Sequence, residues 1–90
     1  MQEPKSTVKM HIVGEQVAAA RKLLRMTQVE LAEATGLTKQ TIIKFERGGN
    51  VRPETVEALR NALLDRGIEF TNGGRPGVNL NRQPAAWQRS

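Results

Sequence analysis

The chain has 90 residues, of which 14 are lysine or arginine and 9 are acidic, and it contains no cysteine. This length allows one small domain, and without cysteine neither a disulfide nor a thiolate metal site can form. No apolar run is long enough to cross a membrane, and residues 1–11 lack the apolar core of a signal peptide, so we expect a cytoplasmic protein. The net charge of +5 favours a polyanionic partner, although a solvated protein can be equally basic.

The N-terminal part predicts a leader followed by one helix. Residues 1–11 are mostly polar and are expected to be disordered, and His11, the single histidine, has no partner for a metal site. The first helix is expected from about Val13 to Arg25, because apolar residues recur at helical spacing at Val13, Val17, Ala20 and Leu24. Arg21 lies beside this apolar stripe rather than opposite it, which leaves open whether it is paired or solvated.

Two short helices joined at a glycine follow. Thr27 and Glu30 have the spacing of a capping box, which predicts a second helix over residues 28–35. Gly36 comes directly after it, and a glycine there can take the left-handed conformation that ends a helix. The third helix is expected over about residues 39–47. A helix, a tight turn with glycine and a second short helix form the helix-turn-helix signature.

The third helix is the candidate reader of DNA base edges. Ile42 and Phe45 give it an apolar inner side, so its polar side chains are expected to point outward; they are Lys39, Gln40, Thr41 and Lys44. Glutamine can pair with adenine, lysine can bind guanine acceptors, and threonine can contact a thymine methyl group. Ile43 also points outward by this geometry. The alternative is a solvated polar face, but residues 38–53 hold four basic residues and one acid, an excess that favours the DNA-reading role.

A loop with two glycines leads to a fourth helix. Arg47 and Arg52 stand at the ends of this loop, where they are suited to phosphate contacts. The fourth helix is expected over residues 53–66, because proline fits the first helical position and Gly67 can end the helix. Its inner stripe is formed by Val56, Leu59 and Leu63.

The remaining residues predict a β-hairpin and a tail. Residues 68–70 and 78–80 alternate apolar and polar side chains around a glycine-rich turn, which is typical of two short strands. An isolated hairpin of this size is marginal in water. It must therefore pack on its own helices or on the same strands of a second copy, and we favour dimerisation. Residues 81–90, which include an isolated Trp87, are expected to be disordered.

The second and third helices with their turn resemble the Cro-type helix-turn-helix domains of phage repressors and small bacterial regulators, the Xre family. The resemblance runs without a gap from Met26 to Pro53 and more loosely from Val13 to Leu64. It rests on Thr27, Gln28, Glu30, Leu31, Ala32, Gly36, Thr38, Thr41, Ile42, Phe45, Glu46, Gly48 and Pro53. It implies an all-α fold, a lambda-repressor-like helix-turn-helix bundle of four short helices over residues 12–67, here followed by a small C-terminal β-hairpin over residues 68–80.

The resemblance also implies roles outside the base-reading face. In this family the arginine that corresponds to Arg21 pairs with the glutamate that corresponds to Glu46, and the pair attaches the reading helix to the first helix; the alternative is a solvated arginine. The glutamine at the start of the second helix contacts a phosphate in relatives, although it can also be a residue chosen for solubility. The candidate phosphate contacts are Gln28, Thr38, Arg47 and Arg52.

The sequence contains no phosphate-binding glycine loop, no nucleophile elbow and no histidine beside a carboxylate pair, so we expect neither an enzyme nor a cofactor. It predicts a sequence-specific regulator of transcription that binds double-stranded DNA, namely a repressor that binds a two-fold operator as a homodimer. The alternative is a protein that keeps this fold but binds and antagonises a second regulator, through the basic helix or through the hairpin and Trp87.

Overall fold

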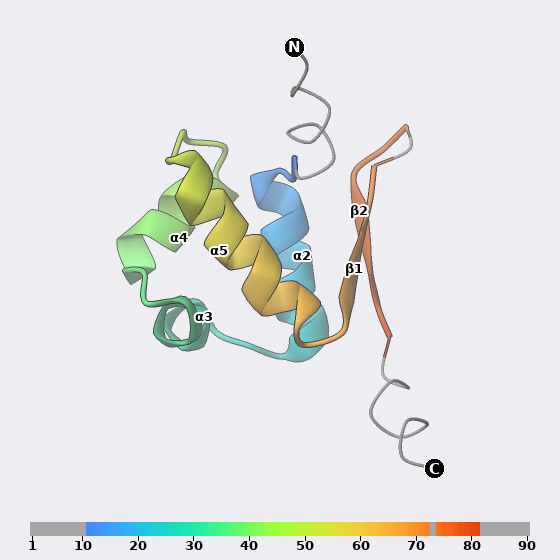
Figure 1. Cartoon of the computed structure of the whole chain (residues 1–90), viewed down its shortest axis with the longest axis horizontal. Coiled ribbons are helices and arrows are strands. Elements are labelled where there is room, and N and C mark those ends of the chain that lie inside the picture. The colour runs from blue at the N-terminus through green and yellow to red at the C-terminus, as the bar shows by residue number, and fades with distance from the viewer. Residues whose placement is uncertain (1–10, 73, 82–90) are drawn as a thin grey trace.

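The computed structural model describes residues 11–72 and 74–81, in which four helices precede a two-stranded antiparallel sheet (Figure 1). The elements are α2 (Gly14–Leu24), α3 (Gln28–Thr35), α4 (Lys39–Glu46), α5 (Pro53–Leu64), β1 (Ile68–Thr71) and β2 (Gly77–Leu80). Their kind and order confirm the predicted fold. The predicted leader and tail, with Trp87, lie outside the described residues, apart from Asn81 and the exposed His11.

Local hydrogen bonds fix the ends of α3, which spans the predicted residues. The side chain of Thr27 accepts a hydrogen bond from the Glu30 N–H at 3.0 Å, and the Thr27 N–H donates to the Glu30 carboxylate at 2.8 Å. This reciprocal capping box occupies two N–H groups that the first helical turn would otherwise leave unpaired. Gly36 ends the helix with a φ of 77°, a left-handed conformation that favours glycine.

The other three helices are shorter than the sequence predicts. α2 starts after Val13 and stops before Arg25, and α4 stops before Arg47, because these residues are caps with non-helical backbone angles. α5 ends at Leu64, two residues earlier than expected. Its last turn tightens there, since the N–H of Gly67 bonds to the carbonyl of Leu64 only three residues back.

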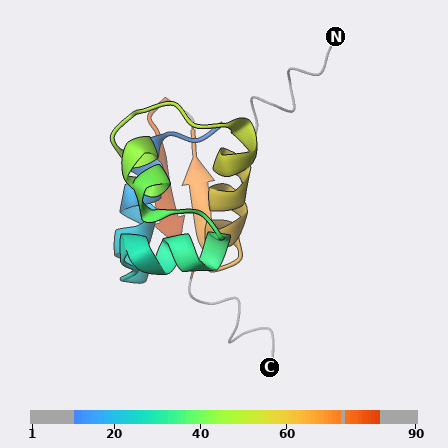
Figure 2. The ribbon, with the colours of Figure 1, turned by 90° about the vertical axis from the view of Figure 1, so that its left-hand side faces the viewer.

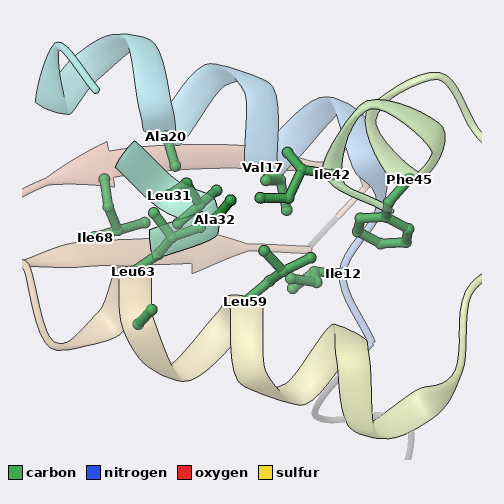
Figure 3. Packing of buried hydrophobic residues seen from close by; sticks show 11 residues of the cluster. Ile12, Val17, Ala20, Leu31, Ala32, Ile42, Phe45, Leu59, Leu63 and Ile68 are labelled. Atoms are coloured by element: carbon green, nitrogen blue, oxygen red, sulfur yellow. The ribbon is translucent and has the colours of Figure 1, made fainter. Parts of the chain in front are cut away.

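One apolar core joins all four helices and β1 (Figure 3). Its buried members are Ile12, Val17, Ala20, Leu31, Ala32, Ile42, Phe45, Leu59, Ala62, Leu63 and Ile68. Val13, a member of the predicted stripe, is only half-buried because it precedes the helix. Burying one such apolar side chain contributes roughly 1.5–3 kcal/mol, so Ile42 and Phe45 hold the inner side of α4 firmly against the core.

The elements form three layers. α4 contacts α3 and α2, and α3 also contacts α5. The hairpin contacts α2 through β2 and α5 through β1. Figure 2 accordingly shows α3 and α4 on the near side of the molecule and the two strands behind α2 and α5. The hairpin and the candidate reading helix therefore lie on opposite sides of the α2–α5 layer.

The hairpin packs on the helices of its own chain. Ile68 pairs with Leu80 and Phe70 with Val78, and this face of the sheet contacts the core, with Ile68 only 1% exposed. The opposite face carries exposed polar side chains, among them Glu69. Of the two packing surfaces that the sequence allows, the chain's own helices therefore cover the apolar face of the sheet.

A buried glutamine joins the hairpin to α2. Gln16 is 2% exposed, and its Oε1 accepts a hydrogen bond from the Val13 N–H at 2.9 Å. Its Nε2 lies 3.1 Å from the Thr71 carbonyl, 3.0 Å from the Gly77 carbonyl and 3.2 Å from the Asn72 Oδ1. Because a buried amide requires hydrogen-bond partners, Gln16 fixes the turn end of the hairpin to the start of α2.

Candidate nucleic-acid interface

Three of the four predicted base-reading residues are exposed on α4. The side chain of Thr38 accepts a hydrogen bond from the Thr41 N–H at 3.2 Å and thereby caps the helix. Lys39, Gln40 and Lys44 are exposed, whereas Ile42 and Phe45 are buried; this inner pair is shown in Figure 3. A short, exposed polar face of this kind fits the width of a DNA major groove.

Two residues of α4 are less exposed than the helical pattern suggests. Thr41 is half-buried, and its hydroxyl lies 2.9 Å from the hydroxyl of Thr38. A contact from Thr41 to a base would therefore use its methyl group or would compete with this local hydrogen bond. Ile43 is also half-buried rather than fully outward.

An ion pair attaches α4 to α2. The Nε of Arg21 donates to the Glu46 Oε2 at 2.8 Å, and its Nη2 donates to the Glu46 Oε1 at 3.0 Å. The two side chains are only 12% and 7% exposed, and the Nη1 of Arg21 also donates to the carbonyl of Met26 at 3.0 Å. This bidentate geometry is the strong form of an arginine–carboxylate pair. It also pairs the one acid of α4, so the exposed charges of this helix are those of Lys39 and Lys44.

Gln28 begins α3 beside this ion pair. Its Nε2 donates to the Glu46 Oε1 at 2.9 Å, so one N–H of the amide is bound inside the protein. The capping box takes the N–H of Thr27 and of Glu30. In the described contacts the backbone N–H groups of Gln28 and Val29 have no partner, and a helix N-terminus with such groups favours an anion.

The loop after α4 places one arginine at each end. Arg47 is the exposed C-cap of α4, and Arg52 is the exposed N-cap of α5. Between them the N–H of Gly49 donates to the carbonyl of Lys44 at 2.8 Å. A methyl group on Gly49 would lie 2.7 Å from the Cγ of Lys44. The absence of a side chain at Gly49 therefore leaves room for the Lys44 side chain in its present position.

The structural roles of three residues were not predicted from the sequence. Gly14 lies so close to α4 that a methyl group on it would be 1.9 Å from the carbonyl oxygen of Phe45. Gly49 leaves room for the side chain of Lys44. Gln16 attaches the hairpin to α2 through its hydrogen bonds. A glycine at the predicted start of a helix, where a side chain is ordinarily preferred, was the available signal for Gly14. The sequence marks Gly49 only as one of the two glycines in the loop after α4, and no local pattern marks Gln16.

The structure thus defines a helix-turn-helix protein whose α4 carries exposed basic residues. The family model described as helix-turn-helix matches residues 17–63, which is more than half of the chain. The chain belongs to this family of Cro- and Xre-type DNA-binding transcriptional regulators, as the sequence resemblance predicts. A search of curated proteins returns no match. In the described residues no helix has the length and apolar character needed to span a membrane.

Proposed function

We propose that the protein is a sequence-specific repressor that binds double-stranded DNA as a homodimer at a two-fold operator. The observation that carries the proposal is the outer face of α4, where Lys39, Gln40 and Lys44 are exposed together and the acid of the helix is paired with Arg21. In this reading α4 enters the major groove and its side chains bind base edges. Occupation of an operator that overlaps a promoter is sufficient for repression.

The phosphate contacts follow from the residues around α4. Gln28 and the start of α3 lie at one side of it, and Arg47 and Arg52 follow it in the loop. Thr38 is exposed at the start of α4, although its hydroxyl also caps the helix. Because Arg47 and Arg52 would each displace counterions from DNA, binding is expected to weaken steeply as salt rises.

The layer order constrains the proposed dimer. Two copies on one duplex must point their α4 helices in the same direction, toward adjacent turns of the major groove. The hairpin lies on the side opposite α4 (Figure 2), so a dimer that stacked the outer faces of two hairpins would direct the reading helices apart. Edge-to-edge antiparallel pairing has its two-fold axis perpendicular to the sheet and keeps both helices on one side. A hairpin-mediated dimer therefore requires pairing at a strand edge.

The experiment begins by selecting bound duplexes from a random pool, with fluorescence anisotropy as the affinity measurement. Lys39→Ala and Gln40→Ala are then each expected to relax the preference at one position of the half-site, by about 1–3 kcal/mol per lost bidentate contact. Lys22→Ala is the charge-matched control, because Lys22 is an exposed lysine on α2. If neither α4 variant changes base preference, the assigned reading face is wrong.

A second measurement separates this proposal from a protein-binding role. Random duplex DNA at low salt should bind weakly to a DNA-reading protein through its basic face. A protein that antagonises another regulator through the same fold would show little such binding. Analytical ultracentrifugation with and without the selected duplex would then establish whether two copies occupy one operator.

A further inference from the structure

The carboxylate of Glu46 holds more than its ion-pair partner. It accepts two hydrogen bonds from Arg21 on α2, at 2.8 and 3.0 Å, and a third from the side-chain amide of Gln28 on α3, at 2.9 Å. The Glu46 side chain is only 7% exposed, so these contacts are shielded from competition by water. The last residue of the reading helix therefore fixes a side chain on the neighbouring helix.

The contact with Glu46 leaves one N–H group of the Gln28 amide available to a ligand. The Gln28 amide carries two N–H groups, and Glu46 uses one of them. A solvated glutamine samples several rotamers, and a ligand that binds it must restrict them. Here the bond to Glu46 restricts the side chain before a ligand arrives, and the second N–H remains to be donated.

We propose that Glu46 is a positioning residue, which orients the Gln28 amide so that its second N–H can donate to a phosphate oxygen of bound DNA. The inference rests on the proposed function, because the phosphate belongs to the duplex that α4 reads. Arg21 has a second part in this arrangement. Its guanidinium neutralises the Glu46 carboxylate, which would otherwise repel the phosphate beside Gln28.

The geometry links two kinds of DNA contact. Because one carboxylate at the end of α4 holds the side chain at the start of α3, the phosphate contact and the reading helix keep a fixed relation to each other. Phosphate contacts set the orientation in which a protein lies on the duplex. Glu46 would therefore influence which bases α4 can reach, although it touches no base itself.

A double-mutant cycle on DNA affinity tests the proposal. The dissociation constant for a selected duplex is measured for wild type, Glu46→Gln, Gln28→Met and the double variant. Gln28→Met is expected to weaken binding by roughly tenfold, the loss typical of one hydrogen bond to a charged group. The loss caused by Glu46→Gln should be about threefold or more smaller when Gln28 is already methionine. Equal losses in the two backgrounds would overturn the proposal.

Lys44→Ala is the matched control for the cycle. It removes an exposed side chain of the proposed base-reading set and leaves the contact between Glu46 and Gln28 in place. Its loss of affinity should be similar in the wild-type and Gln28→Met backgrounds, as expected for a substitution that does not act through Gln28. If the Lys44→Ala loss also shrinks in the Gln28→Met background, the cycle reports general damage and the positioning role is rejected.

A measurement on the free wild-type protein does not depend on the folding of any variant. In an NMR spectrum of the side-chain amides, one Gln28 proton should exchange with solvent more slowly than either proton of the exposed Gln40. If both Gln28 protons behave like those of Gln40, Glu46 does not hold the amide and the inference is wrong. Failure of the wild type to bind any duplex would refute the proposed function and this inference with it, whereas binding with equal losses in the cycle refutes the inference alone.

Discussion

Substitution of Gly14 by alanine tests how closely α2 packs against α4. The added methyl group would lie 1.9 Å from the Phe45 carbonyl oxygen, 2.8 Å from its carbonyl carbon and 2.9 Å from the Glu46 Cα. All three atoms are backbone, so no side-chain rotation can relieve the overlap. To reach 3.0 Å, the closest approach that Cβ atoms show, the two helices must separate locally by at least 1.1 Å.

The expected cost follows from two opposing effects. Overpacking of this kind costs about 1–3 kcal/mol, and contact with backbone places Gly14→Ala at the upper end of that range. Alanine regains at most about 1 kcal/mol of helix propensity, so the free energy of unfolding should fall by about 2 kcal/mol. For a domain of this size such a loss lowers the melting temperature by roughly 10 °C.

Urea and thermal unfolding followed by circular dichroism measure this effect. Duplex binding should weaken by about tenfold, because the displacement moves the C-terminal end of α4 and a lost base contact costs about that much. Gly74→Ala is the control, since a methyl group there meets no atom within 4 Å and acts only through the positive φ of 150°. A Gly14→Ala protein with the stability and the DNA affinity of Gly74→Ala would refute the reasoning.

Three further substitutions test the ion pair of α4, the loop after α4 and the attachment of the hairpin. Arg21→Ala should lower the free energy of unfolding in urea by about 3–5 kcal/mol, because it leaves the buried Glu46 carboxylate without its cation. Gly49→Ala should change stability by no more than about 1 kcal/mol, yet alter the base preference found by duplex selection, because its methyl group would lie 2.7 Å from the Lys44 Cγ. Gln16→Leu should cost about 2 kcal/mol in the same urea experiment, and should speed hydrogen exchange in the hairpin, because it removes a buried donor from three acceptors.

Each of these predictions has an outcome that would contradict it. An Arg21→Ala loss within error of zero would mean that the arginine behaves as a solvated side chain. An unchanged base preference in Gly49→Ala would show that the contact of Lys44 with DNA does not depend on the space left by Gly49. For Gln16→Leu, the same change at the exposed Gln40 is the control for stability, and equal losses at the two positions would show that the hairpin does not depend on the buried amide.

Local chemistry explains why much of the fold was predictable. The capping box of Thr27 and Glu30 and the glycine at position 36 mark the ends of α3, and each acts over no more than one helical turn. The spacing of Ile42 and Phe45 likewise predicts which side of α4 is buried, and therefore which side chains remain outside. Helix ends were misplaced at caps such as Arg25. Arg25 has a left-handed conformation, and an arginine in the sequence gives no indication of it.

The sequence by itself determined the elements, their order and the outward polar face of α4, because caps and helical periodicity are properties of neighbouring residues. Only the tertiary structure decided which distant groups meet. Gln16 reaches a carbonyl 61 positions away in β2, and Gln28 binds a carboxylate 18 positions away on α4. Gly14 likewise permits an approach to the end of α4 that no side chain would allow. Such contacts depend on how three layers pack together, and that packing has no counterpart in the spacing of residues along the chain.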